Sequence, residues 1–154
     1  MQVLVVEDDV MLADCLAEAL EDRGHVVCGV ASTVAEAMTL ARQHHPDAAI
    51  LDMQLGSKEC GSDIADQLAE SGEFGHMAIL YVTGEAERVH REARVGHACL
   101  NKPYTLATLD AALVIVGEIA REGATLRPLP RGMELLHQPR SRLSLLSDDD
   151  WCGG

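Results

Sequence analysis

Aromatic residues are scarce in this chain of 154 residues, which contains one tryptophan, two tyrosines and one phenylalanine. Hydrophobic residues still make up 47% of the sequence, so the chain can bury a sizeable core. That core must be built from aliphatic side chains and methionine. The length favours one domain, with room for a short additional segment.

Basic residues are also few, because 12 Lys and Arg stand against 25 Asp and Glu and give a net charge of −13. The whole excess lies in residues 1–123, which hold 21 acidic and 8 basic residues. A nucleic acid requires a basic surface, and an anionic membrane surface requires one as well. We therefore expect neither nucleic acid nor a membrane as a partner.

The five cysteines form no C-x-x-C pair, and their number is odd. This pattern is neither a zinc framework nor a disulfide scaffold, and it is typical of reduced thiols in the cytosol. The N-terminus lacks the features of a signal peptide, and no apolar run approaches the roughly 20 residues that span a bilayer. We expect a cytoplasmic protein whose scattered histidines are surface residues rather than ligands.

Five short apolar runs recur along the chain, at residues 3–6, 26–31, 48–51, 77–82 and 98–100. Continuous apolar runs are typical of strands buried on both faces of a parallel sheet. The segments between them carry apolar residues at helical spacing. This alternation predicts an α/β fold with a doubly wound five-stranded parallel sheet. The strand order 2-1-3-4-5 satisfies the rule of right-handed crossovers.

The composition changes after residue 123, where three prolines and two short apolar patches, residues 133–136 and 143–146, occur among polar residues. Thirty-one residues are too few for a separate DNA-binding or catalytic domain. We therefore expect one domain over residues 1–123 and a C-terminal tail over 124–154. Disorder of the tail, and docking of either patch on the domain or on a second subunit, both stay open.

Polar residues follow four of the five expected strands, and these residues are Glu7, Asp8, Asp9, Asp52, Thr83 and Lys102. Taken singly, each has an ordinary interpretation as a helix cap, a turn residue or a solvated charge. In a doubly wound sheet, however, the site lies at the carboxyl ends of the strands. The set therefore predicts one pocket that contains all of these side chains.

The residue types in this pocket suit phosphoryl transfer. Carboxylates that share a cleft repel each other, and a hard cation such as Mg²⁺ relieves that repulsion. The metal then offsets the charge of a phosphoryl group, which a carboxylate can attack to form an aspartyl phosphate. Lys102 can supply a second positive charge, and Thr83 can donate a hydroxyl hydrogen bond.

Four segments together resemble the receiver domain of two-component response regulators, and in order they are VVEDD at 5–9, ILD at 50–52, VTG at 82–84 and NKPY at 101–104. The resemblance covers about residues 2–122. It implies a flavodoxin-like (βα)5 fold. It also implies a phosphoacceptor of a two-component system or phosphorelay. Because only the short tail follows, we expect a receiver that stands alone.

Residue by residue, the resemblance implies a metal site beside the phosphoacceptor. Asp52 would take the phosphate, Asp8 would bind Mg²⁺ directly, and Glu7 would hold the metal through water. Asp52 itself and the backbone carbonyl of Gln54 would be further ligands. These assignments come from the family pattern and not from the spacing alone.

The resemblance also implies that Thr83 is the switch hydroxyl and that Lys102 binds the phosphate, before a cis Pro103. The chain departs from the pattern in two places within the domain: Gly56 stands where many receivers have proline, and Cys99 replaces the usual switch aromatic. Without a ring to rotate, we expect the signal to pass through residues 83–85 and the polar helix at 85–94.

The implied partners are a histidine kinase or histidine phosphotransfer protein and an unknown downstream protein, bound by a monomer or a homodimer. We expect no enzymatic activity beyond autophosphorylation from phosphodonors and slow autodephosphorylation. A phosphatase or phosphotransferase is disfavoured because position 54 is Gln and not the second Asp common in such enzymes. An interaction scaffold that works without phosphorylation is the alternative, and it is disfavoured because Asp52 and Lys102 are both present.

Overall fold

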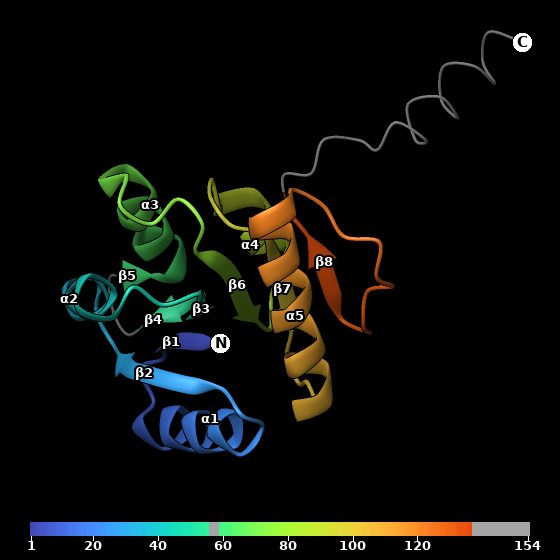
Figure 1. Ribbon diagram of the computed structural model, residues 1–154, viewed down its shortest axis with the longest axis horizontal. Coiled ribbons are helices and arrows are strands. Elements are labelled where there is room, and N and C mark those ends of the chain that lie inside the picture. The colour runs from blue at the N-terminus through green and yellow to red at the C-terminus, as the bar shows by residue number, and fades with distance from the viewer. Residues whose placement is uncertain (56–58, 137–154) are drawn as a thin grey trace, which may run out of the picture.

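The structure is a computed structural model that describes residues 1–55 and 59–136. Its main sheet has six strands in the order β2-β1-β3-β6-β7-β8 (Figure 1). In chain order the strands of this sheet are β1 (Gln2–Val6), β2 (Val26–Ala31), β3 (Ala48–Asp52), β6 (Ala78–Thr83), β7 (Ala98–Asn101) and β8 (Met133–Leu135). The first five pair in parallel, which confirms the expected order.

A sixth strand, which the sequence did not predict, extends the five parallel strands at one edge of the sheet. β8 pairs antiparallel with β7, and it comes from the segment after residue 123. The backbone N–H of Asn101 donates to the carbonyl of Gly132, and the N–H of Leu136 donates to that of His97. An edge strand offers unpaired backbone groups, and here the first apolar patch of the tail satisfies them. The second patch, residues 143–146, lies outside the described residues.

Five helices cover the two faces of the sheet (Figure 1). The α1 and α5 helices pack on one face, and α2, α3 and α4 pack on the other. Their bounds are α1 (Val10–Asp22), α2 (Val34–His44), α3 (Gly61–Ser71), α4 (Ala86–Glu92) and α5 (Leu106–Glu122). Among residues 1–55 and 59–136, no helix is both long and apolar enough to cross a membrane.

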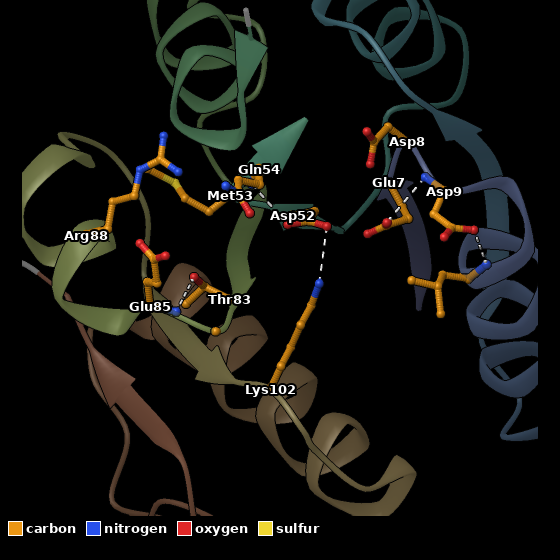
Figure 2. Close-up of a pocket in the computed structure, with 12 residues that line it drawn as sticks. Glu7, Asp8, Asp9, Asp52, Met53, Gln54, Thr83, Glu85, Arg88 and Lys102 are labelled. Carbon is orange, nitrogen blue, oxygen red and sulfur yellow. Dashed lines mark hydrogen bonds and ion pairs between the residues drawn. The ribbon is translucent and has the colours of Figure 1, made fainter. Parts of the chain in front are cut away.

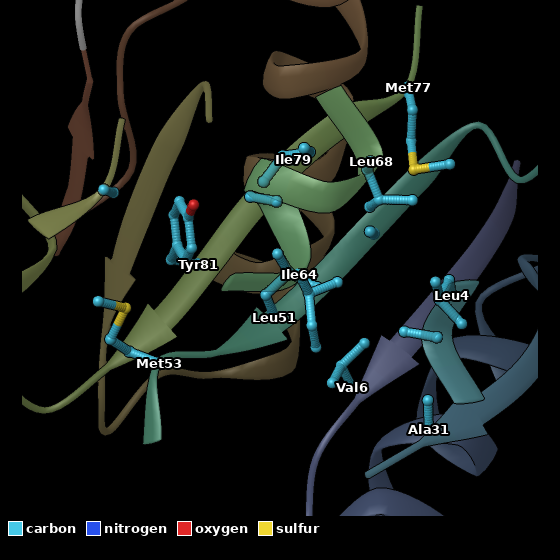
Figure 3. Packing of buried hydrophobic residues seen from close by; sticks show 14 of the residues in the cluster. Leu4, Val6, Ala31, Leu51, Met53, Ile64, Leu68, Met77, Ile79 and Tyr81 are labelled. Atoms are coloured by element: carbon cyan, nitrogen blue, oxygen red, sulfur yellow. The ribbon is translucent and has the colours of Figure 1, made fainter. Parts of the chain in front are cut away.

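The two faces explain why the strands are continuous apolar runs. Successive side chains of a strand point to opposite faces, so a strand covered on both sides is apolar throughout. Val3 and Val5 pack on the α1 and α5 side, whereas Leu4 and Val6 pack on the other side. Figure 3 shows this second cluster, in which the buried Tyr81 packs among aliphatic and methionine side chains.

A small ribbon that the sequence did not predict follows β3. Its strands, β4 (Gln54–Leu55) and β5 (Glu59–Cys60), pair antiparallel. Gly61 then begins α3 under the end of β3, where an added Cβ would lie 2.6 Å from the carbonyl oxygen of Asp52. Only glycine fits there, because any side chain at position 61 would collide with the backbone of Asp52. The start of α3 can therefore pack directly against the end of β3. Gly56, the departure from the family pattern, lies outside the described residues.

Candidate functional site

A pocket of about 530 Å³ opens at the carboxyl ends of the parallel strands (Figure 2). Each strand that ends there contributes polar residues directly at or after its last position. The structure brings all of the expected site residues to this pocket, namely Glu7, Asp8, Asp9, Asp52, Gln54, Thr83 and Lys102. They come from segments that are far apart in the sequence, and the parallel topology alone joins them.

Asp52 is the last residue of β3, and its side chain is held from two directions. The ammonium group of Lys102 lies 3.2 Å from Oδ2, and the backbone N–H of Gln54 donates to Oδ1 at 3.0 Å. Only 6% of Asp52 is exposed. Figure 2 shows the Lys102 side chain pointing toward this carboxylate. The carboxylate is therefore paired with a cation and fixed in orientation, as a nucleophile requires.

Three carboxylates lie close enough to share one cation. One oxygen each from Glu7, Asp8 and Asp52 lies within 4.8 Å of the others. Burial raises the pKa of Glu7 from its ordinary value of 4.5 to about 8, helped by a hydrogen bond to Asp52 and by the charge of Asp52. Lys102 opposes this rise. Oxygen donors in this arrangement suit Mg²⁺, which would relieve the repulsion between the carboxylates and offset the cost of burying their charge.

Asp9, the third acid of the loop after β1, serves as a helix cap. Asp9 caps α1, and its side chain accepts hydrogen bonds from the backbone N–H groups of Met11 and Leu12. Its own N–H donates to Oε1 of Glu7 at 3.3 Å. The structure assigns the cap to Asp9, and Asp8 lines the pocket beside Glu7.

Thr83 and Lys102 occupy the opposite side of the pocket. Thr83 ends β6 and is buried, and its hydroxyl oxygen accepts a hydrogen bond of 2.9 Å from the backbone N–H of Glu85. Lys102 follows β7, and its N–H donates to the carbonyl of Thr83. The peptide bond between Lys102 and Pro103 is cis, as the resemblance implied.

Two further charged residues, which the sequence did not single out as site residues, also line the pocket. Glu85 directly precedes α4 and Arg88 lies in its first turn, and Figure 2 shows Glu85 near Thr83 and Arg88 near Met53. The Nε of Arg88 pairs with Glu92 at 3.0 Å, which holds the guanidinium at the rim. A signal for them existed: the helix after a strand begins at the carboxyl edge of the sheet, so its first turn faces the site.

A doubly wound sheet with an aspartate, a lysine and two further acids at its carboxyl edge places the chain in the class of receiver proteins. The family model for the response regulator receiver domain matches residues 3–114. The chain therefore belongs to the response regulator receiver domain family, whose members act in two-component signalling.

Known proteins of this family resemble the chain over most of its length. The transcriptional regulatory protein PdtaR of Mycobacterium tuberculosis is 30% identical over 122 residues, which are 79% of this chain and 58% of PdtaR. The polar-differentiation response regulator DivK of Brucella abortus is 30% identical over 109 residues, which are 68% of this chain and 85% of DivK. The chain thus spans little more than half of PdtaR.

Solved structures show the same fold. The receiver domain of a modulated diguanylate cyclase from Desulfovibrio desulfuricans has a TM-score of 0.64 at 28% identity, over 78% of this chain and 95% of that one. A mutant form of the anti-anti-sigma factor PhyR from Bartonella quintana has a TM-score of 0.64 at 25% identity, over 80% of this chain and 50% of that one.

Proposed function

We propose that this receiver takes a phosphoryl group on Asp52 with the help of Mg²⁺ and signals through contacts with other proteins. The observation that supports the proposal best is the position of Asp52. Asp52 has an oxygen within 4.8 Å of oxygens of Glu7 and Asp8, pairs with Lys102, and shares its pocket with the buried Thr83. The acidic charge of the domain favours protein partners over nucleic acid.

The metal ligands in this proposal are Glu7 through water, Asp8 and Asp52 directly, and the backbone carbonyl of Gln54. Bound Mg²⁺ would supply positive charge that offsets the charge of the phosphoryl oxygens. Asp52 forms the new bond to phosphorus through a carboxylate oxygen, while the bond between phosphorus and the donor breaks. The protein contributes mainly alignment and charge, as is general for phosphoryl transfer.

Lys102 and Thr83 both contact the phosphoryl group, Lys102 already during its transfer to Asp52. The Lys102 ammonium pairs with Asp52 Oδ2 in the structure. It can exchange that partner for a phosphoryl oxygen on Asp52 with only a small movement. The hydroxyl of Thr83 donates to another phosphoryl oxygen. In the structure this hydroxyl accepts a hydrogen bond from the backbone N–H of Glu85. To reach the phosphoryl group, it moves away from that N–H.

That exchange gives the signal a route into α4. The α4 helix has seven residues, and Val89 is its one buried residue. Few apolar contacts hold it, so a shift at its start costs little free energy. Cys99, in place of an aromatic, is fully buried in the core and has no ring to rotate. We therefore assign the relay to residues 83–85 and α4.

An exposed apolar surface at the start of α1 supports docking of a phosphodonor protein. Val10, Met11 and Leu12 are 71%, 78% and 55% exposed, and Leu12 also lines the pocket. Exposed apolar side chains gathered beside a site are suited to contact with a protein partner. A histidine kinase or a histidine phosphotransfer protein in the cytoplasm fits this place, since its phosphohistidine must reach Asp52.

Incubation with acetyl phosphate and Mg²⁺, followed by intact-mass measurement, tests the proposal. The wild-type protein should gain one phosphoryl group, and Asp52→Asn should gain none. Asp14→Asn is the matched control, because Asp14 is an exposed acid on α1 outside the pocket, and it should behave as the wild type. Equal labelling of all three proteins would refute the assignment. No labelling of any would favour a scaffold that works without phosphorylation.

A further inference from the structure

Three side chains of different chemistry meet at a place away from the acidic pocket. His90 of α4, Cys99 of β7 and Glu134 of β8 each bring one donor atom within 4.8 Å of the other two. The Nε2 of His90 lies 3.4 Å from Oε1 of Glu134. The three residues belong to different elements of the fold, so their spacing in the sequence matches no metal-binding motif.

The fold builds this cluster from strand register. β7 and β8 pair antiparallel with Cys99 directly opposite Glu134, and residues that face each other in this way lie on the same side of the sheet. Cys99 packs in the core cluster that contains Val89, so this side is the one that α4 covers. His90 follows Val89 on α4 and reaches the same place. The contact of the C-terminal strand with the sheet therefore creates the cluster.

We propose that His90, Cys99 and Glu134 form a Zn²⁺ site with water as the fourth ligand. An imidazole nitrogen, a thiolate sulfur and a carboxylate oxygen are the three ligand types that zinc uses in proteins. Mg²⁺ prefers oxygen donors alone, so this site and the acidic pocket select different metals. The His90 and Glu134 side chains are 41% and 48% exposed, which gives an ion and its water access to the site.

The surroundings of the three donors suit a cation. The Glu134 carboxylate lies beside the Cys99 thiol and the His90 imidazole, so a negative charge stands next to both of the other donors. A bound Zn²⁺ would neutralise both a thiolate and a carboxylate and displace the thiol proton. The side-chain amide of Asn101 lies 3.5 Å from Oε2 of Glu134 and donates to it. This contact helps to orient the carboxylate, as hydrogen-bond partners of metal ligands do.

The site would join three elements that otherwise meet by strand pairing and packing. Since Glu134 belongs to β8, the three-ligand site exists only while the C-terminal strand is docked. Zn²⁺ would therefore stabilise the docked strand and fix α4 to it, because a ligand that binds one state favours that state. The inference rests on the fold and does not depend on phosphorylation of Asp52.

Cobalt is a suitable probe, because a thiolate ligand gives Co²⁺ a charge-transfer band that oxygen ligands do not give. The full chain, reduced and in excess Mg²⁺, should bind one Co²⁺ with this band, and Zn²⁺ should abolish it. His90→Gln, Glu134→Gln and Cys99→Ala should each weaken Zn²⁺ binding at least tenfold, since even outer-shell changes at metal sites cost about 10- to 100-fold.

Matched controls separate this site from other donors. Cys28→Ala removes a half-buried cysteine elsewhere on the sheet, and Asp8→Asn alters the acidic pocket, so both should keep the band. His90→Gln and Glu134→Gln change exposed side chains, so they decide the matter even if Cys99→Ala perturbs folding. Absence of the band in the wild type would overturn the proposal. So would a band that keeps its strength in both of these exposed variants.

Discussion

The ammonium group of Lys102 lies 3.2 Å from Oδ2 of Asp52, although the two residues are 50 positions apart in the chain. Lys102 stands just beyond the end of β7, and Asp52 ends β3, with β6 between these two strands. The cation is therefore in place before any phosphoryl group arrives. A positive charge that needs no rearrangement is most effective where negative charge will develop.

Lys102→Ala should slow phosphorylation by acetyl phosphate about 100-fold, the typical cost of losing one positioned electrostatic group. The rate of mass increase measures this effect. Lys102→Arg keeps the charge with a different shape, so it should recover part of the rate. If Lys102→Ala is labelled as fast as the wild type, the ammonium has no part in the transfer.

Binding of Mg²⁺ should release a proton from Glu7. The pKa of Glu7 is raised to about 8, so at pH 7 its carboxyl group is mostly protonated, and a cation favours the ionised form. Mg²⁺ affinity should therefore weaken as the pH falls below about 8. Calorimetry at pH 7 in two buffers of different ionisation enthalpy measures the released protons.

The same raised pKa has a consequence for stability in the absence of metal. Between about pH 4.5 and pH 8, Glu7 is ionised in the unfolded chain but still protonated in the folded protein. The free energy of unfolding should therefore fall as the pH rises through this range. Glu7→Gln should remove this slope and the proton release together. Buffer-independent heats of Mg²⁺ binding for the wild type would contradict the assignment.

The parallel sheet and the centre of the site can be predicted from the sequence, because buried parallel strands leave a clear pattern. Asp52, Thr83 and Lys102 each stand at or just after the end of an apolar run, and topology alone then implies a shared pocket. Arg88 left a weaker signal, because only its place in the first turn of the helix after β6 pointed to the site, and an arginine on a short polar helix is usually a solvated charge. Its position depends on where α4 packs.

The C-terminal strand was harder to predict for a different reason. β8 has three residues, too few for an alternating pattern to stand out, and its partner β7 has four. Its pairing depends on an edge that exists only after the parallel sheet has formed. The cluster of His90, Cys99 and Glu134 depends in turn on that pairing, so it could not be seen from motif spacing.

Removing the anchor of β8 should destabilise the domain. Leu136 is 3% exposed in the core, whereas Leu126, in the connection before β8, is fully exposed. Leu136→Ala should lower the free energy of unfolding by about 2 kcal/mol, the lower end for core leucines. Leu126→Ala should change it little. Urea unfolding compares the two variants, and equal midpoints would mean that the strand does not dock as described.

Amide hydrogen exchange gives an independent test of the same strand. The N–H groups of Asn101 and Leu136 bond across the β7–β8 pair, so both should exchange slowly. Complete exchange of Leu136 within seconds would show that the segment is not held against the sheet in solution.

Beryllofluoride, which imitates a phosphoryl group on an aspartate, should loosen or shift the start of α4. The proposed cause is the hydroxyl of Thr83, which would turn toward the new group and give up the hydrogen bond that it accepts from the N–H of Glu85. Exchange in residues 84–92 should change in the presence of Mg²⁺, while exchange in α5 should not. Thr83→Ala should abolish the change, and Thr83→Ser should retain it. Unaltered exchange in α4 with changes elsewhere would contradict the proposed relay.

The central claim is that Asp52 carries the phosphoryl group and that Mg²⁺ is needed to place it there. Borohydride reduces an aspartyl phosphate to homoserine, which marks the modified residue permanently. After treatment with acetyl phosphate and borohydride, peptide mass mapping should find homoserine at position 52 when Mg²⁺ is present and none when it is chelated. Homoserine at another aspartate, or at position 52 without a divalent cation, would contradict the account.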